Sequence, residues 1–128
     1  MLKLNYTEDG LYLERVAKSL EDVLRDRVVL MARLGETLYV ESGSASFLLP
    51  QDAPGLSRLV QLLQHERYED VAVAAVDDEC VEICMEGCWM AASPDADTGT
   101  FLTALDDETE FLVARLWEAT QVQATFLA

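Results

Sequence analysis

The stretch VAVAAVDDECVEICMEGCWMAA, residues 71–92, decides the fold class of this chain. Residues 71–76 form a short apolar run, Asp77-Asp78 has the composition of a turn, and Cys80 to Glu86 alternates like a returning strand. Gly87 interrupts this strand as a bulge would, and an apolar segment continues beyond it. The pattern predicts an antiparallel hairpin.

An amphipathic helix is expected on each side of this hairpin. Asp52 is predicted to cap the earlier helix, with Pro54 in its first turn, where no amide donor is needed. The later helix follows a cluster of carboxylates, which stabilise the positive end of a helix. The apolar stripes of the two helices are Leu56, Leu59, Val60 and Leu63, and Leu112, Val113, Leu116 and Trp117.

The first third of the chain has a more ambiguous pattern. Residues 2–7 alternate as a strand, and Asp9-Gly10 is a strong hairpin signal. Leu11 to Lys18 fit a returning strand, but Leu13, Val16, Leu20, Val23 and Leu24 also fit a helical stripe, and a capping box at Ser19 is typical of a short helix over 20–27. Whether residues 11–27 are strand or helix is therefore left open by the sequence. The apolar run from Val28 to Leu34 is predicted to be a buried strand, with further strands over 37–41 and 46–49.

These elements predict an α+β fold with an antiparallel sheet and two long helices, as a single domain over residues 1–128. Ser46-Phe47-Leu48 and Asp52 are echoed 54 residues later by Thr100-Phe101-Leu102 and Asp106. This echo raises the hypothesis of an internal duplication, with one copy in residues 1–67 and the other in 68–128.

Two resemblances follow from these segments. A run of strands followed by a helix, twice, is similar in topology to the Whirly-type single-stranded-DNA-binding fold. The opening of the chain, together with Ala45-Ser46-Phe47-Leu48-Leu49-Pro50 and Pro54-Gly55-Leu56, resembles an uncharacterised conserved family of small cyanobacterial proteins. That second resemblance implies no activity and no site residues.

Charge is distributed unevenly along the chain, whose formal net charge is −15. Residues 1–67 carry ten acids and eight bases, whereas residues 68–128 carry fourteen acids and one base, Arg115. Such a field repels nucleic acid and anionic membranes, and it favours a neutral or basic protein partner. No apolar run reaches the length of a membrane span and no secretory signal is visible, so a cytoplasmic location is expected.

The three cysteines, Cys80, Cys84 and Cys88, are spaced by four residues, which matches neither a zinc site nor a redox pair. On a straight strand they share one face, opposite Val81, Ile83 and Met85. We expect them to be reduced thiols acting as small apolar residues on the core face. No metal and no cofactor is expected.

The sequence predicts a non-enzymatic protein that binds another protein or pairs with itself as a homodimer. No nucleophile elbow, phosphate loop or Gly-rich cofactor motif is present. Aromatic residues anchor interfaces and acidic clusters select partners. The candidate contact residues are Trp89, Trp117, Phe126, Asp106, Asp107 and Glu108.

Two alternatives remain. The first is a regulator that binds single-stranded nucleic acid through a local basic patch, and its candidate residues are Arg15, Lys18, Arg25, Arg27 and Arg33. The second is a small-molecule binder or enzyme, which requires a deep pocket with a convergent polar group near Cys88 or His65.

Overall fold

The computed structural model describes the backbone of residues 1–66 and 70–127, and the side chains of residues 1–64 and 70–119. The chain divides into two compact units. The first unit consists of Met1–Gly43 and Gly87–Leu105, and the second of Ser44–Glu86 and Asp106–Ala128. Each unit is described in turn.

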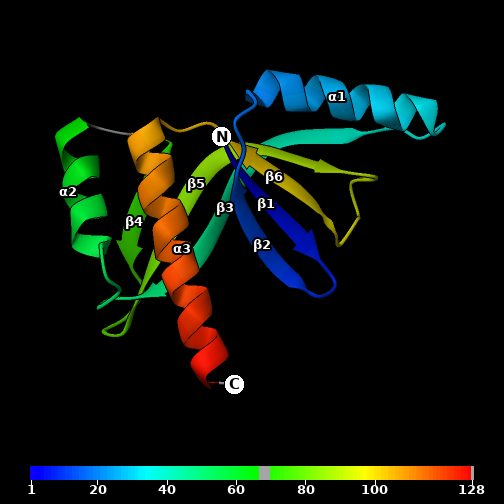
Figure 1. Cartoon of the computed structure of the whole chain (residues 1–128). Coiled ribbons are helices and arrows are strands. Elements are labelled where there is room, and N and C mark those ends of the chain that lie inside the picture. The colour runs from blue at the N-terminus through cyan, green and yellow to red at the C-terminus, as the bar shows by residue number, and fades with distance from the viewer. Residues whose placement is uncertain (67–69, 128) are drawn as a thin grey trace. The chain divides into compact units, whose positions relative to one another are not determined.

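Strands and helices alternate irregularly along the chain (Figure 1). The elements are β1 (Leu2–Thr7), β2 (Gly10–Arg15), α1 (Leu20–Arg33), β3 (Tyr39–Pro50), α2 (Leu56–Glu66), β4 (Val71–Ala75), β5 (Cys80–Ala91), β6 (Gly99–Thr103) and α3 (Asp107–Leu127). The strand order is β2-β1-β6-β5-β3, and β4 also pairs with β5. The pairings of β1 with β2, β1 with β6, β4 with β5 and β5 with β6 are antiparallel. The expected α+β class with an antiparallel sheet is confirmed.

The first unit is built on the predicted N-terminal hairpin. Thr7 faces Gly10 across the turn, and Gly10 has a φ of 138°, which glycine adopts without a steric penalty. On its other edge, β1 pairs with β6 so that Leu4 lies opposite Phe101. Both residues are almost fully buried, as is Leu102. Alternation of apolar residues along β1 therefore supplies the core of this unit.

Gly87 lies where β5 enters the first unit. A Cβ atom at this position would collide with the backbone carbonyl oxygen of Leu102 and would lie 2.9 Å from the Phe101 ring. The strand continues through Gly87 without a break in β5. Close approach of β6 therefore explains the glycine that interrupts the apolar pattern.

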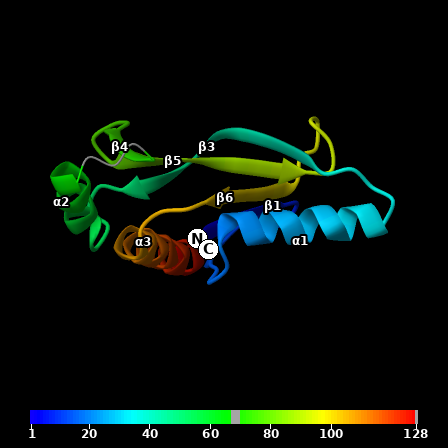
Figure 2. The same cartoon turned by 90° about the horizontal axis from the view of Figure 1, so that it is seen from above.

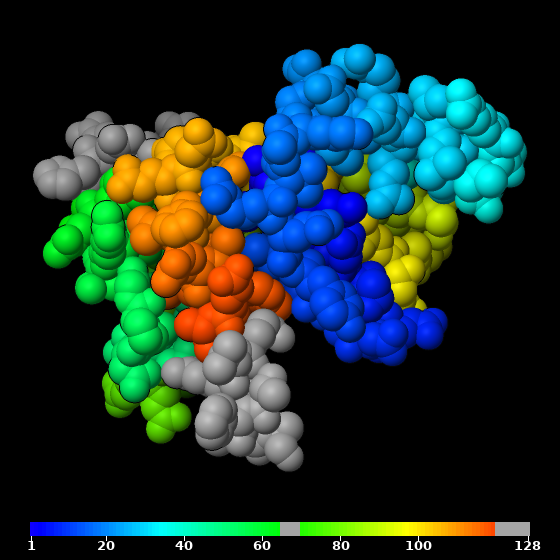
Figure 3. Space-filling view, viewed as in Figure 1, coloured from blue at the N-terminus to red at the C-terminus, as the bar shows by residue number. Residues whose placement is uncertain are grey.

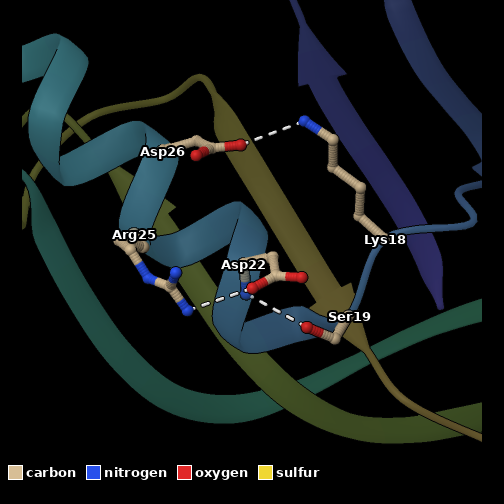
Figure 4. A network of polar contacts seen from close by, with 5 residues as sticks. All are labelled: Lys18, Ser19, Asp22, Arg25 and Asp26. Carbon is tan, nitrogen blue, oxygen red and sulfur yellow. Dashed lines mark hydrogen bonds and ion pairs between the residues drawn. The ribbon is translucent and has the colours of Figure 1, made fainter.

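Helix α1 resolves the ambiguity in residues 11–27, because β2 ends at Arg15 and the helix begins at Leu20. Ser19 is its N-cap, and the Ser19 hydroxyl accepts a hydrogen bond from the backbone N–H of Asp22 at 3.2 Å (Figure 4). The predicted strand from Val28 to Leu34 is wrong, since these residues continue the helix. A capped helix start followed by good helix formers outweighs one short β-branched run, and the helix stops before Gly35, whose φ is 72°.

The second unit contains the hairpin of β4 and β5, as predicted. Val71 lies opposite Met85 and Ala75 opposite Val81. Asp77 shapes the turn, because its carboxylate accepts hydrogen bonds from the backbone N–H groups of Glu79 and Cys80, each at 2.8 Å. Helix α2 packs against α3 and β4. The core residues of this unit include Leu49, Leu59, Ile83, Met85, Val113 and Leu116.

The start of α2 differs from the prediction. The helix begins at Leu56, so Asp52 is not its cap and Pro54 is not in its first turn. Ala53 instead donates a backbone hydrogen bond to Pro50, and Gly55, with a φ of 88°, leads directly into the helix. A turn that needs left-handed backbone at Gly55 sets the boundary here, and this takes precedence over the capping preference of Asp52.

The expected number of helices is also wrong, because the described residues contain α1 in addition to α2 and α3. Residues 1–67 therefore hold two helices, so the Whirly-type pattern of one helix after each run of strands is not found. The two units are interleaved along the chain and do not coincide with residues 1–67 and 68–128. An ancestral duplication stays a prediction.

Candidate functional site around helix α1

Helix α1, drawn in blue in Figure 2, is the only helix among the described residues of the first unit. None of its residues is buried. Four large apolar side chains are about half exposed or more. We call them the α1 patch, and they are Val28 (52%), Val29 (45%), Leu30 (48%) and Leu34 (63%). Figure 3 shows α1, in light blue to cyan, open to solvent on the face in view. Apolar surface of this kind is normally covered by a partner.

Local polar contacts lie at the N-terminal end of α1 (Figure 4). Asp22 accepts a hydrogen bond from the guanidinium of Arg25 at 3.0 Å, and Lys18 forms an ion pair with Asp26 at 3.0 Å. All four of these side chains are exposed, so each pair contributes at most about 1 kcal/mol. The helix is therefore stabilised by its cap and its own hydrogen bonds more than by burial.

A cavity of about 560 Å³ lies between α1 and the β1–β2 hairpin. We call it the α1 cavity. Its apolar lining includes Val16, Val23 and Leu30. Its charged lining consists of four bases and two acids, namely Lys3, Arg15, Lys18, Arg27, Glu14 and Asp26. The excess of positive charge contrasts with the acidic character of the whole chain.

Arg27 lines the α1 cavity and also extends to a neighbouring one. It also lines a second cavity, of about 220 Å³, together with Met31 and Met90. The Arg27 side chain is half-buried, and it makes no ion pair or hydrogen bond within the part of the chain that the structure describes. Lys3 and Lys18, in contrast, are paired with Glu14 at 3.5 Å and with Asp26 at 3.0 Å. Arg27 is therefore the cation best placed to meet an anionic ligand.

The five basic residues of the nucleic-acid hypothesis do not form one patch. Arg15, Lys18 and Arg27 line the α1 cavity. Arg25 is paired with Asp22 outside the cavity lining, and Arg33 lies exposed in the last turn of α1. The structure thus brings three of the five together around a concave site.

The two tryptophans predicted as contact residues are half-buried. Trp89 packs edge-to-face with Tyr6 in the first unit, with ring centroids 5.4 Å apart. In the second unit Trp117 packs in the same way with Phe47, also at 5.4 Å. Both rings have intramolecular partners, which reduces the area they offer to another protein.

The remaining predicted contact residues lie in α3 or immediately before it. Asp106 caps this helix, since its carboxylate accepts a hydrogen bond from the backbone N–H of Thr109 at 2.7 Å. Asp107 and Glu108 are exposed in the first turn, as expected from the helix dipole. The side chain of Phe126 lies outside the described residues.

The three cysteines do not lie on the face of β5 that the sequence predicts. All three are free and half-buried. On β5 the alternating residues Val81, Ile83 and Met85 are buried, so the prediction that the thiols occupy the core face is wrong. The larger apolar side chains take the core face and displace the smaller thiols to the opposite one. Cys84 donates a hydrogen bond to the carboxylate of Glu82 at 2.7 Å.

A pocket near Cys88 or His65 stays a prediction, because the side chain of His65 lies outside the described residues. Within residues 1–64 and 70–119, no group of three His, Cys, Asp or Glu side chains is arranged to hold a metal ion. In the same part of the chain, no helix combines the length and apolar character needed to cross a membrane.

Sequence reasoning missed the α1 patch. Its signal was visible as the apolar run from Val28 to Leu34, which was assigned to a buried strand. The capping box at Ser19 was the better guide, because a helix started there continues until a residue stops it. Extending the helix to Gly35 would have placed apolar residues on all its sides, which is the mark of a helix that needs covering.

No curated protein and no solved structure matches the chain. One family model, Alr0857-like, matches residues 1–121. The expected membership of a family without known activity is thereby confirmed, whereas a cyanobacterial source and the Whirly resemblance are not. With almost its entire length matched, the chain belongs to the Alr0857-like family.

Proposed function

We propose that this protein is a non-enzymatic module that self-associates through the α1 patch. A single observation carries the proposal: α1 buries none of its residues while it exposes four large apolar side chains. Exposed apolar surface is costly in water, and a second copy of the chain removes it from solvent. Cyclic dimers with two-fold symmetry are the commonest way in which identical chains associate.

The distribution of charge supports a second copy as the partner. The second unit carries fourteen acids and three bases, a net charge of −11, whereas the first unit carries ten acids and six bases, a net charge of −4. Residues 18–34, which include α1, hold four bases and three acids. Two copies of α1 therefore meet with little of the repulsion that the rest of the chain would cause.

The size of the α1 patch sets the expected affinity. Burying one half-exposed valine or leucine contributes about 1 kcal/mol. Consecutive residues of a helix point about 100° apart, so a single interface does not cover all four side chains of the α1 patch. Val28 and Val29 from each copy make four side chains, which contribute roughly 4 kcal/mol before the cost of association is subtracted. A weak dimer that dissociates on dilution is therefore expected, rather than an obligate one.

Light scattering coupled to size exclusion tests the proposal. The wild-type chain should approach twice its monomer mass of 14.2 kDa as its concentration rises. The variant V28Q/V29Q should remain a monomer, because glutamine removes apolar surface without adding charge and favours the helix more than valine does. Val76 is a matched control, since it is 53% exposed in the second unit, and V76Q should dimerise like the wild type.

A wild-type chain that stays monomeric at about 0.5 mM, where an association of this strength would be visible, would contradict self-association. Equal dimerisation of V28Q/V29Q and wild type would show that the interface lies elsewhere. A neutral or basic heterologous partner, the predicted contact set around Trp89 and Trp117, and a cytoplasmic location remain hypotheses. The Whirly-like scaffold and the cyanobacterial source carry no part of the proposal.

A further inference from the structure

We infer that the α1 cavity binds a small organic phosphate monoester, with the phosphate at Arg27 and the apolar part against Val23 and Leu30. This site goes beyond self-association. Leu30 belongs to both the α1 patch and the cavity lining, whereas Val28 and Val29, which carry the test of self-association, lie on other sides of α1 and outside the lining. The inference depends on the charge of the cavity, on the state of Arg27 and on the apolar lining.

The charge of the cavity favours an anion. Its lining carries two more bases than acids, in a chain whose formal net charge is −15. Lys3 and Lys18 are each paired with an acid of the lining, so the two acids are already neutralised. Arg15 has an interaction of its own, so Arg27 supplies the positive charge that remains for a phosphate monoester, which carries between one and two negative charges near pH 7.

Arg27 is the expected phosphate ligand. The guanidinium of Arg27 has no hydrogen-bonding partner among the described residues, and its nitrogen atoms keep some exposure to solvent, so a bound anion can reach them. The planar guanidinium can donate two parallel hydrogen bonds to phosphate oxygens. Arg27 also reaches the smaller cavity beside Met31, so space is present on more than one side of its side chain.

The apolar lining argues against inorganic phosphate alone. Val16, Val23 and Leu30 line the same cavity as the bases, and a volume of about 560 Å³ is within the range of small-molecule sites. An apolar group attached to the phosphate would cover these side chains. A nucleic-acid strand fits less well, because its successive phosphates would extend from this one basic site over an acidic molecule.

Isothermal titration calorimetry with phenyl phosphate tests the site directly. Phenyl phosphate should bind the wild type at least tenfold more tightly than either inorganic phosphate or phenol. The variant R27Q should weaken the binding at least tenfold. Arg25 provides the matched control, since it lies on the same helix outside the cavity lining, and R25Q should change the affinity no more than twofold.

A second variant of Arg27 distinguishes the effect of its positive charge from the effect of its two parallel hydrogen bonds. R27K keeps the positive charge but cannot donate two parallel hydrogen bonds, so its affinity should lie between those of wild type and R27Q. Binding should persist in the monomeric variant V28Q/V29Q, which keeps the test independent of self-association. Unchanged affinity in R27Q, equal affinity for phenol and phenyl phosphate, or tighter binding of a 20-nucleotide single-stranded DNA would each overturn the inference.

Discussion

Glu82 and Cys84 lie two residues apart on β5, and their side chains form a hydrogen bond of 2.7 Å between Sγ and Oε1. This hydrogen bond, helped by partial burial and by the negative charge of Glu82, raises the pKa of the Cys84 thiol. At a given pH the thiolate fraction is therefore smaller than in an ordinary cysteine. Since the thiolate is the reactive form, Cys84 is protected from alkylation and oxidation.

The variant E82Q should lower the pKa of Cys84, because it removes both the carboxylate acceptor and the negative charge. Alkylation of Cys84 by iodoacetamide at pH 8 should become several-fold faster, and the difference should vanish at a pH well above both pKa values. Peptide mass spectrometry measures the rate at each cysteine. Cys88 in the same samples is the internal control, and an equal acceleration at Cys88 would point to a general loosening instead.

Gly87 and Arg27 show how far single residues could be interpreted from sequence. The interruption at Gly87 was visible, but the carbonyl of Leu102 that requires a glycine is fifteen positions away along the chain. Arg27 was one of five candidate bases, and nothing in its local sequence separated it from Arg25. Its half-buried, unpaired state depends on the fold around it, because burial is set by residues distant in the sequence.

At the scale of elements, the strands over residues 2–7 and 71–76 and the helix behind Asp106 were predictable from local signals. Alternation, turn residues and caps act within a few positions, so they can be recognised without the fold. The sequence failed at Val28 to Leu34, where β-branched residues suggest a strand and the preceding cap starts a helix. The residues continue the helix because adding a residue to an existing helix costs less free energy than starting a new element.

The contribution of the Asp106 cap to the stability of α3 can be tested by mutation. The variant D106A should lower the free energy of unfolding by about 1 kcal/mol, because the backbone N–H of Thr109 loses its partner. The loss should appear in global unfolding by urea, since α3 carries the buried residues Leu112, Val113 and Leu116. D106N keeps a side-chain oxygen and should retain most of the stability. Equal losses in D106A and D106N would show that charge matters more than the hydrogen bond.

For the whole molecule, charge is the dominant property. The second unit carries fourteen acids against three bases, and the mutual repulsion of the excess acids opposes the compact state. Salt shortens the range of the repulsion to about 10 Å at 0.1 M. The stability of this protein should therefore increase with ionic strength.

Urea unfolding of the monomeric variant V28Q/V29Q in about 0.02 M and about 0.3 M NaCl, with Debye lengths well above and below 10 Å, measures this effect. The midpoint should rise with salt. Adding D78N and E79Q, which neutralise two exposed acids of the second unit, should raise the midpoint at low salt and reduce its salt dependence. A midpoint that is insensitive to salt in both proteins would contradict a destabilising role for the charge.

Composition, alternation and turn residues determined the α+β class, the hairpin of β4 and β5 and the acidic character of the chain, because these properties are local or additive. Tertiary structure alone decided which face of β5 is buried, which base lacks a partner, and that the apolar side chains near the C-terminal end of α1 remain exposed. These properties depend on which surfaces of the protein meet. On β5, for example, either the thiols or the larger apolar side chains could face the core, and close packing of the interior decides between them, not the neighbouring residues in the sequence.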